Sequence, residues 1–159
     1  RQIIKTKPRT LILFERSEHD LYLIEKELIA LAQQIHSGDN AIVPILASIL
    51  NQGRLTAVCH AFAVQTIYHA AAYKHVPMVE KNPSEAVRNN ALGTYKAALA
   101  AIDAEVETFV LISTDKAVRP TNTMGATKRF AEMILQGLST REGTKTRFTM
   151  VRFGGFIKT

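Results

Sequence analysis

Three neighbouring residues, Thr114, Asp115 and Lys116, carry a hydroxyl, a carboxyl and an amine. Side chains of these types can donate, protonate and deprotonate at one carbon skeleton, which is the work of general acid–base catalysis. They follow residues 108–113, a mostly apolar run typical of a buried strand. A turn rich in Ser, Thr and Asp after a strand would look the same, so this segment alone leaves catalysis and a structural turn open.

A lysine near the start of a predicted helix is a candidate for cofactor binding. Met124 and Lys128 lie four residues apart in the helix predicted at residues 124–138, so they share one helical face. Lys128 could therefore hold the ribose hydroxyls of a nicotinamide cofactor. A solvated lysine is the alternative interpretation of this position.

An acid, Glu15, ends the apolar run of residues 10–14. In dinucleotide-binding folds, an acid after the second strand accepts hydrogen bonds from the adenosine ribose hydroxyls and disfavours a 2′-phosphate. Glu15 thus favours NAD over NADP, although the neighbouring Arg16 could reverse this preference, and an exposed acid at a strand end is the alternative. Neither G-x-G-x-x-G nor G-x-x-x-x-G-K-[ST] occurs, so we expect a glycine loop and its strand upstream.

The strand predicted at residues 66–70 runs into three alanines, Ala70, Ala71 and Ala72. Small side chains there would let the backbone lie against a flat dinucleotide. Lys74 offers a cation to a phosphate or sugar oxygen. Three alanines are also typical of a helix or of close packing, so their position after a strand is what indicates binding.

Predicted strands alternate with predicted helices along the chain. The strands are continuously apolar, which indicates a parallel sheet covered on both faces and a doubly wound, Rossmann-like α/β fold. Ligands of such sheets lie beyond the carboxyl ends of the strands, where the candidate residues occur. The predicted strands are residues 10–14, 41–45, 66–70, 108–113 and 148–153, and the predicted helices are residues 17–38, 54–62, 82–104 and 124–138.

The composition limits the classes of function. The chain has 159 residues, 47% of them hydrophobic, a formal net charge of +6 and one cysteine, Cys59. These values indicate a globular protein and exclude a disulfide framework or a multi-cysteine metal site. The scattered basic residues fit anionic small molecules better than nucleic acid. No apolar run is long enough for a membrane span and the histidines lack metal-ligand spacing, so we expect a cytoplasmic protein without a metal.

Four segments resemble one protein family in order and spacing. They are residues 69–77, 89–94, 113–122 (Ser-Thr-Asp-Lys-Ala-Val-Arg-Pro-Thr-Asn) and 124–129. The chain is similar to the nucleotide-sugar 4,6-dehydratases of bacterial polysaccharide and glycan biosynthesis, within the extended short-chain dehydrogenase/reductase superfamily. The resemblance implies a UDP-sugar substrate, above all UDP-N-acetylglucosamine, and a bound NAD or NADP. It also implies a homo-oligomeric parent enzyme. Whether an anchor holds this enzyme at the cytoplasmic face of the inner membrane is left open.

The resemblance assigns catalytic roles to the three residues after the predicted strand. Asp115 would be the general acid that helps water leave from C6 of the sugar, and Lys116 would remove the C5 proton. Thr114 would hydrogen-bond the C4 hydroxyl. In the family, a hydride passes from C4 to the cofactor and returns to C6, so no external oxidant is needed.

The resemblance also assigns binding roles, and the chain departs from the superfamily pattern at one position. Lys128 would hold the nicotinamide ribose, and Lys74 and Asn90 would lie near the substrate. Met124 occupies the position of the superfamily's usual tyrosine, the base that takes the C4 hydroxyl proton, and a thioether cannot do this. Dehydratases of this group with methionine there are similar to the chain, whereas an epimerase usually keeps the tyrosine, so a dehydratase is favoured over an epimerase.

The resemblance further implies an incomplete enzyme. Residues 1–159 are expected to form one partial dinucleotide-binding domain, without the first strand and its glycine loop and without the C-terminal substrate domain. Residues 155–159 also diverge from the family's N-V-L-G stretch. We therefore expect this fragment to be inactive alone, and a non-catalytic nucleotide-binding module is a second hypothesis.

Overall fold

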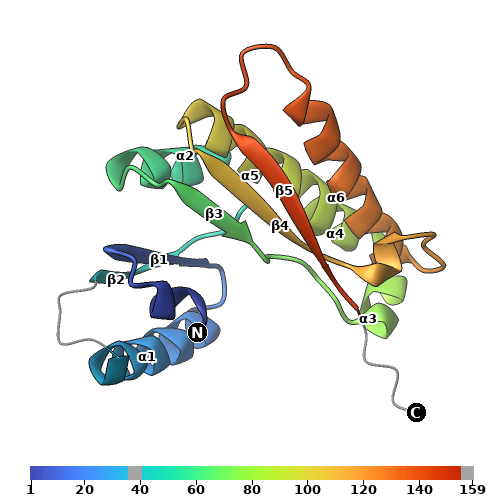
Figure 1. The fold of residues 1–159 in the computed structure, drawn as a ribbon. Coiled ribbons are helices and arrows are strands. Elements are labelled where there is room, and N and C mark those ends of the chain that lie inside the picture. Colours follow the sequence, from blue (N-terminus) through green and yellow to red (C-terminus); the bar gives the residue numbers. More distant parts are fainter. Residues whose placement is uncertain (36–40, 155–159) are drawn as a thin grey trace. The chain divides into compact units, whose positions relative to one another are not determined.

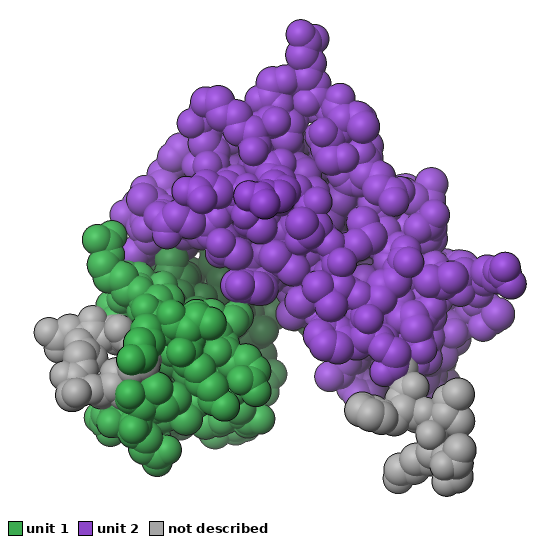
Figure 2. Space-filling model, in the orientation of Figure 1, with its two compact units in different colours: residues 1–48 green, residues 49–159 purple. Residues whose placement is uncertain are grey.

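The computed structural model describes residues 1–35 and 41–154 (Figure 1). The chain divides into two compact units, unit 1 with residues 1–48 and unit 2 with residues 49–159 (Figure 2). Each unit has a parallel sheet of its own. That the two units form one partial dinucleotide-binding domain stays a prediction.

Unit 1 is a β-α-β unit. Its elements are η1 Ile3–Thr6, β1 Thr10–Glu15, α1 Glu18–Ile35 and β2 Ala41–Leu46. The strands β1 and β2 pair in parallel along their whole length, with α1 between them in the chain. The amide of Asp20 donates to Ser17 Oγ over 3.3 Å, so the helix begins at the predicted capping serine. The helix end predicted near residues 37–38 lies outside the described residues.

Unit 2 is built on a three-stranded sheet in the order β3-β4-β5. Its elements are α2 Gln52–Ala61, β3 Thr66–His69, α3 Val76–Lys81, α4 Pro83–Ala86, η2 Val87–Leu92, α5 Gly93–Asp103, β4 Thr108–Thr114, η3 Asp115–Ala117, α6 Thr123–Ser139 and β5 Arg147–Phe153. Both strand pairings are parallel, so the carboxyl ends of all three strands meet at one edge. The predicted Rossmann-like α/β class is confirmed.

The two faces of the sheet in unit 2 differ in burial. Along β4, Phe109, Leu111 and Ser113 are buried, whereas the residues that alternate with them are half-buried. Figure 1 shows α5 and α6 on one side of this sheet, and α6 contacts both β4 and β5. On the other face, Tyr68 and Val151 are about half exposed. Within the described part of unit 2, the predicted helical cover is therefore seen on one face.

The single helix predicted at residues 82–104 is instead three successive segments, α4, η2 and α5. The middle segment, η2, is a π-helical turn, whose hydrogen bonds span five residues instead of four, and such turns are frequent at functional sites. The turn buries Asn89 and Asn90 next to each other. Helix α3 was not predicted, because its six residues are too few to show a helical period.

Candidate active site

Thr114, Asp115 and Lys116 lie where β4 ends and η3 begins. Thr114 Oγ1 donates to Asp115 Oδ1 over 2.9 Å and accepts from the Lys116 amide over 3.3 Å. Lys116 Nζ lies 3.8 Å from Asp115 Oδ1, and the two side chains are 48% and 50% exposed. The structure thus brings the three predicted groups together at the sheet edge, with the acid and the amine open to a small molecule.

The first turn of α6 packs directly on this segment because Gly125 has no side chain. A Cβ at Gly125 would lie 2.4 Å from the carbonyl oxygen of Lys116. Asn122 caps the helix, since its Oδ1 accepts from the Gly125 amide over 2.8 Å. The carboxylate of Glu80 accepts from the amide and the hydroxyl of Thr123. The backbone of Lys116 is therefore held against a helix start that is itself fixed by α3.

Met124 has a packing role. Its side chain is 5% exposed and forms a buried cluster with Val79 and Ala86, against which Tyr73 and Val76 also pack. A thioether is well suited to such an irregular apolar site. The residue that departs from the superfamily pattern is thus part of the core below the loop after β3.

Lys128 is buried beneath the end of β4, with 8% of its surface exposed. Its Nζ donates to the carbonyl oxygen of Ile112 over 2.6 Å. Burial lowers the pKa of Lys128 to about 8, and the charge of Glu132 opposes this shift. The alternative of a solvated lysine is therefore wrong at this position, while the contact with a ribose stays a prediction.

His69, the last residue of β3, is a buried neighbour of this lysine. Its Nε2 lies 2.9 Å from Thr94 Oγ1, within hydrogen-bond distance. Burial, with the charge of Lys128 as the second cause, lowers the pKa of His69 to about 3. The imidazole is therefore neutral at pH 7 and serves as a hydrogen-bonding group inside the core.

The carboxylate of Glu132 is a site residue that the sequence analysis missed. It has no exposed side-chain surface and binds Arg152 through both oxygens, over 2.9 Å from Nε and 2.7 Å from Nη2. Ser113 Oγ donates to it over 2.8 Å and Arg129 Nη1 over 3.0 Å. The bonds from Arg152 are the main cause that lowers the pKa of Glu132 to about 2. An acid four residues after Lys128, on the apolar face of a predicted helix, is the signal that could have revealed it.

The side chain of Asn90 holds the loop that follows β3. Its Oδ1 accepts from the Tyr73 amide over 2.8 Å and from Asn89 Nδ2 over 3.1 Å. Its Nδ2 donates to the Tyr73 carbonyl and to Thr127 Oγ1, each over 3.0 Å. Asn90 is 1% exposed, so here it fixes the segment that carries the three alanines and Lys74. The predicted contact of Asn90 with substrate stays a prediction.

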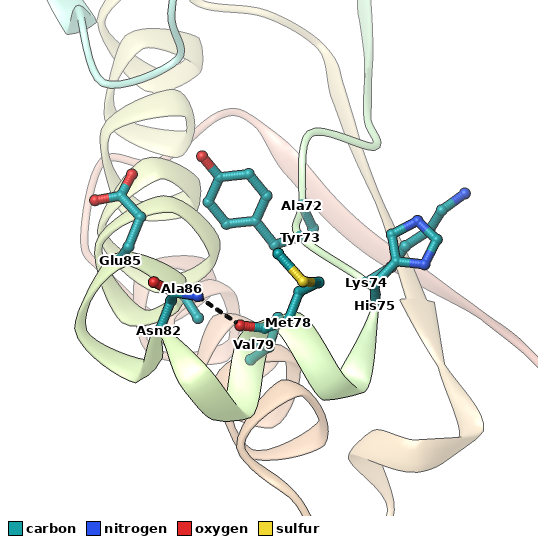
Figure 3. Close-up of a pocket in the computed structure, with 9 residues that line it drawn as sticks. All are labelled: Ala72, Tyr73, Lys74, His75, Met78, Val79, Asn82, Glu85 and Ala86. Carbon is teal, nitrogen blue, oxygen red and sulfur yellow. Dashed lines mark hydrogen bonds between the residues drawn. The ribbon is translucent and has the colours of Figure 1, made fainter.

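A cavity of about 460 Å³ opens beside this loop (Figure 3). Its volume lies within the range of small-molecule sites. Most of its lining is apolar, and Asn82 and Glu85 bring polar groups to it, whereas the side chain of Lys74, also a lining residue, points away from Tyr73 and Glu85 in Figure 3. In Figure 3, the ring of Tyr73 lies between the loop and the helix that carries Glu85. The lining residues are Ala72, Tyr73, Lys74, His75, Met78, Val79, Asn82, Glu85 and Ala86.

Glu15 and Arg16 belong to unit 1, where Glu15 ends β1 as predicted. Glu15 Oε1 accepts from the amide of Arg16 over 2.7 Å and from the amide of Ser17 over 2.9 Å. These two bonds fix the carboxylate in the turn between β1 and α1. The side chain is therefore oriented at the carboxyl end of its strand, the position that the sequence analysis gave it.

Residues 1–35 and 41–154 contain no group of three or more His, Cys, Asp or Glu side chains placed to hold a metal ion. The same part of the chain has no helix that is both long and apolar enough to cross a membrane. Cys59 is buried, which raises its pKa to about 11, so its thiol is not activated as a nucleophile.

Known proteins are similar to this chain over nearly its whole length. The family described as "Polysaccharide biosynthesis protein" matches residues 1–159. The capsular polysaccharide biosynthesis protein CapD of Staphylococcus aureus is 45% identical over 157 residues, which are 99% of this chain and 25% of the relative. A UDP-N-acetylglucosamine 4,6-dehydratase (inverting) of Campylobacter jejuni is 30% identical over 152 residues, 95% of this chain and 42% of the relative. The chain thus spans less than half the length of these relatives.

Solved structures share the fold. Pen from Bacillus thuringiensis superposes with a TM-score of 0.83 and 33% identity, over 96% of this chain and 44% of that one. A dTDP-glucose 4,6-dehydratase of Streptomyces venezuelae, solved with NAD bound, gives a TM-score of 0.72 at 20% identity, over 89% of this chain and 46% of that one. The second likeness is one of fold alone.

Proposed function

The chain belongs to the polysaccharide biosynthesis protein family, and we propose that the full-length protein containing it is a nucleotide-sugar 4,6-dehydratase. Its substrate is a UDP-sugar, UDP-N-acetylglucosamine above all, and its product is a 4-keto-6-deoxy sugar for surface polysaccharide or glycan synthesis. The chain spans 25% and 42% of two relatives, so we propose the activity for the full-length protein and not for this chain alone. The name of the second relative, a UDP-N-acetylglucosamine 4,6-dehydratase, supports the proposal.

The observation that carries the proposal is the exposed pair of Asp115 and Lys116 at the end of β4. An elimination across C5–C6 needs a base and an acid on adjacent carbons at the same time, and these side chains lie 3.8 Å apart. Thr114 adds a hydroxyl that bonds to Asp115 and would bind the C4 hydroxyl of the sugar. An epimerase needs the hydride step alone, so it has no use for this pair, and buried Met124 cannot act as its base.

The proton balance of this pair closes without an outside acid or base. A proton moved from Lys116 Nζ to Asp115, directly or through a water, leaves a neutral amine beside a neutral carboxyl. Lys116 then takes the C5 proton, the C5–H electrons form the C5–C6 double bond, and Asp115 protonates the C6 hydroxyl, which leaves as water. The pair ends as ammonium and carboxylate, which is how it began.

A bound NAD or NADP supplies the hydride transfer between C4 and C6. The residues present fit such a cofactor. In unit 2, Lys128 is a buried cation at the sheet edge and residues 70–72 have small side chains that would allow a flat group to approach. In unit 1, the carboxylate of Glu15 is fixed at the end of β1, where it would accept from the adenosine ribose hydroxyls. Arg16 beside it would suit a 2′-phosphate, so the choice between NAD and NADP depends on these two neighbours.

Lys74 and Asn90 are the proposed substrate-binding residues. Lys74, at the cavity beside the loop after β3, would attract an anionic part of the UDP-sugar. Asn90 would act on the same substrate through the loop it holds. We place the reaction in the cytoplasm and the protein in a homo-oligomer, with any anchor at the cytoplasmic face of the inner membrane supplied by other segments. Neither nucleic acid nor a metal ion has a role in this proposal.

The decisive experiment is to incubate the purified full-length protein with UDP-N-acetylglucosamine and to follow the sugar nucleotide by mass spectrometry. The expected product is lighter by one water, about 18 mass units, and carries a 4-keto group. A protein that binds NAD yet leaves the substrate mass unchanged would be the non-catalytic module instead. An isomer of equal mass, inverted at C4, would identify an epimerase.

The matching variant is Lys116→Ala, which removes the proposed base. We expect turnover to fall by at least about 100-fold, the usual contribution of a positioned general base. Lys145→Ala is the control, because Lys145 is 72% exposed and pairs with Glu105 on the surface. Full activity in Lys116→Ala would remove Lys116 from the proposed mechanism.

A further inference from the structure

One buried carboxylate joins three elements at the sheet edge that carries the candidate residues. Glu132, on α6, receives hydrogen bonds from Ser113 near the end of β4 and from Arg152 near the end of β5. Ser113 and Arg152 are register partners in the sheet, so their side chains reach the same face. Arg129, one turn earlier on α6, completes the set. All four bonds are charge-assisted, and this kind is about twice as strong as a neutral hydrogen bond.

The same turn of α6 carries Lys128 at the end of the strand. Lys128 Nζ donates to the carbonyl of Ile112, the residue directly before Ser113. Consecutive residues of β4 are therefore tied to α6 through the lysine and through the carboxylate. The segment from Thr114 to Lys116 begins directly after them. A shift of α6 relative to β4 would consequently displace Lys128 and the proposed acid–base pair together.

We infer that Glu132 is a positioning residue, whose carboxylate fixes the ends of β4 and β5 against α6 and holds Lys128 beside the strand end as a charged ammonium. Its link to catalysis rests on the proposed function. Its effect on Lys128 does not, because that effect follows from the hydrogen bonds and charges of unit 2.

The charges around Lys128 give the direction of the effect. Without the charge of Glu132, Lys128 would keep its burial and would lose the charge that raises its pKa, while Arg129 and Arg152, the cations paired with Glu132, would remain. The pKa of Lys128 would then fall further below about 8. The titratable and charged side chains on the neighbouring elements are Asp115 and Lys116 on η3, Tyr68 and His69 on β3, Arg147 and Arg152 on β5, Glu80 and Lys81 on α3, Glu85 on α4, Arg88 on η2, and Tyr95, Lys96 and Asp103 on α5.

The test that does not depend on activity is an NMR titration of Lys128 in the full-length protein, with ¹³C-labelled lysine and assignment from the signal lost in Lys128→Arg. In Glu132→Gln, the Lys128 midpoint should move to lower pH than in the wild type. An unchanged midpoint in a folded Glu132→Gln protein would overturn the inference. Glu105→Gln is the control, because it also removes an acid from an ion pair, one that is exposed. An equal shift in this control would show a general charge effect and would also overturn the inference.

The activity test separates this inference from the proposed function. In the dehydratase assay, Glu132→Gln should lower kcat and move the alkaline limb of the pH profile to lower pH. Glu132→Asp keeps the charge with a shorter reach, so its alkaline limb should stay close to that of the wild type. A wild-type protein without dehydratase activity would contradict the proposed function, while the NMR titration would still decide the role of Glu132.

A second variant covers the case in which Glu132→Gln does not fold. Arg129 is 41% exposed, so Arg129→Gln should fold. It removes a cation from the group around Lys128, and the Lys128 midpoint should therefore move to higher pH, opposite to the shift in Glu132→Gln. A midpoint that does not rise in Arg129→Gln would overturn the inference.

Discussion

The close contact between α6 and the acid–base segment predicts an unusual cost for one methyl group, in Gly125→Ala. The new Cβ would lie 2.4 Å from the carbonyl oxygen of Lys116 and 3.2 Å from its carbonyl carbon. Ordinary carbon–oxygen contacts are about 3.3–3.6 Å long. The backbone of Lys116 or the first turn of α6 must therefore move by about 1 Å, and neither is a flexible side chain.

The expected change in stability of Gly125→Ala follows from two opposing contributions. Overpacking a tight site costs about 1–3 kcal/mol, and replacing glycine by alanine in a helix returns about 1 kcal/mol. With the overpacking cost at the upper end of its range, Gly125→Ala loses about 2 kcal/mol of stability after the helix gain is subtracted. This loss lowers Tm by about 4–8 °C for a chain of this size. Gly137→Ala is the matched control on the same helix, because a Cβ there meets no atom within 4 Å. It keeps the gain of about 1 kcal/mol and should raise Tm by about 2–4 °C.

Thermal melting followed by circular dichroism and the dehydratase assay would measure both effects. Because a misplacement of about 1 Å at a catalytic group can cost about 100-fold in rate, Gly125→Ala should lose activity beyond its loss of stability. Gly137→Ala should keep full activity. The reasoning is refuted if the two variants shift Tm in the same direction, or if Gly125→Ala melts and turns over like the wild type.

Two further variants test the buried polar groups. His69→Gln should remove a loss of stability in acid: the folded pKa of His69 is about 3 and the unfolded value is 6.5. Protonation of His69 therefore costs the wild type little stability above pH 6.5 and about 2 kcal/mol by pH 5. Urea denaturation at pH 7 and pH 5 would measure this loss in both proteins. The assignment is wrong if His69→Gln loses as much stability at pH 5 as the wild type. Asn90→Ala removes the two hydrogen bonds that the Asn90 side chain makes with the backbone of Tyr73 and should cost about 2–4 kcal/mol by urea denaturation. A change below about 0.5 kcal/mol would contradict the role of the amide in holding the loop.

The sheet and the residues after its strands could be predicted because short apolar runs and turn residues are local signals. Each of the five predicted strands agrees within two residues at each end with a strand in the described part of the chain, and Thr114, Asp115 and Lys116 lie at the end of β4. Lys128 shares the buried face of α6 with Met124, as their spacing predicts. These predictions depend on neighbours in sequence and need no knowledge of tertiary contacts.

The features that sequence reasoning missed depend on contacts between distant residues. The π-helical turn η2 forms where Asn90 meets the backbone of Tyr73 and the side chain of Thr127, which lies 37 residues away. Nothing in the local spacing of residues 82–104 marks this interruption. Likewise, the need for glycine at position 125 appears only when the carbonyl of Lys116 is placed beside it.

The buried face of α6 shows how charged residues within an apolar stripe indicate a site. Its buried residues include Met124, Ala131 and Leu135, and Lys128 and Glu132 interrupt them at a spacing of four. Apolar residues of similar volume would hold α6 to the sheet about as well, because a buried ion pair must first overcome the desolvation of its charges. Packing therefore does not account for this cluster. What the charges add is a fixed orientation of the helix and a negative charge near Lys128, and both act at the strand end where the proposed acid–base pair begins.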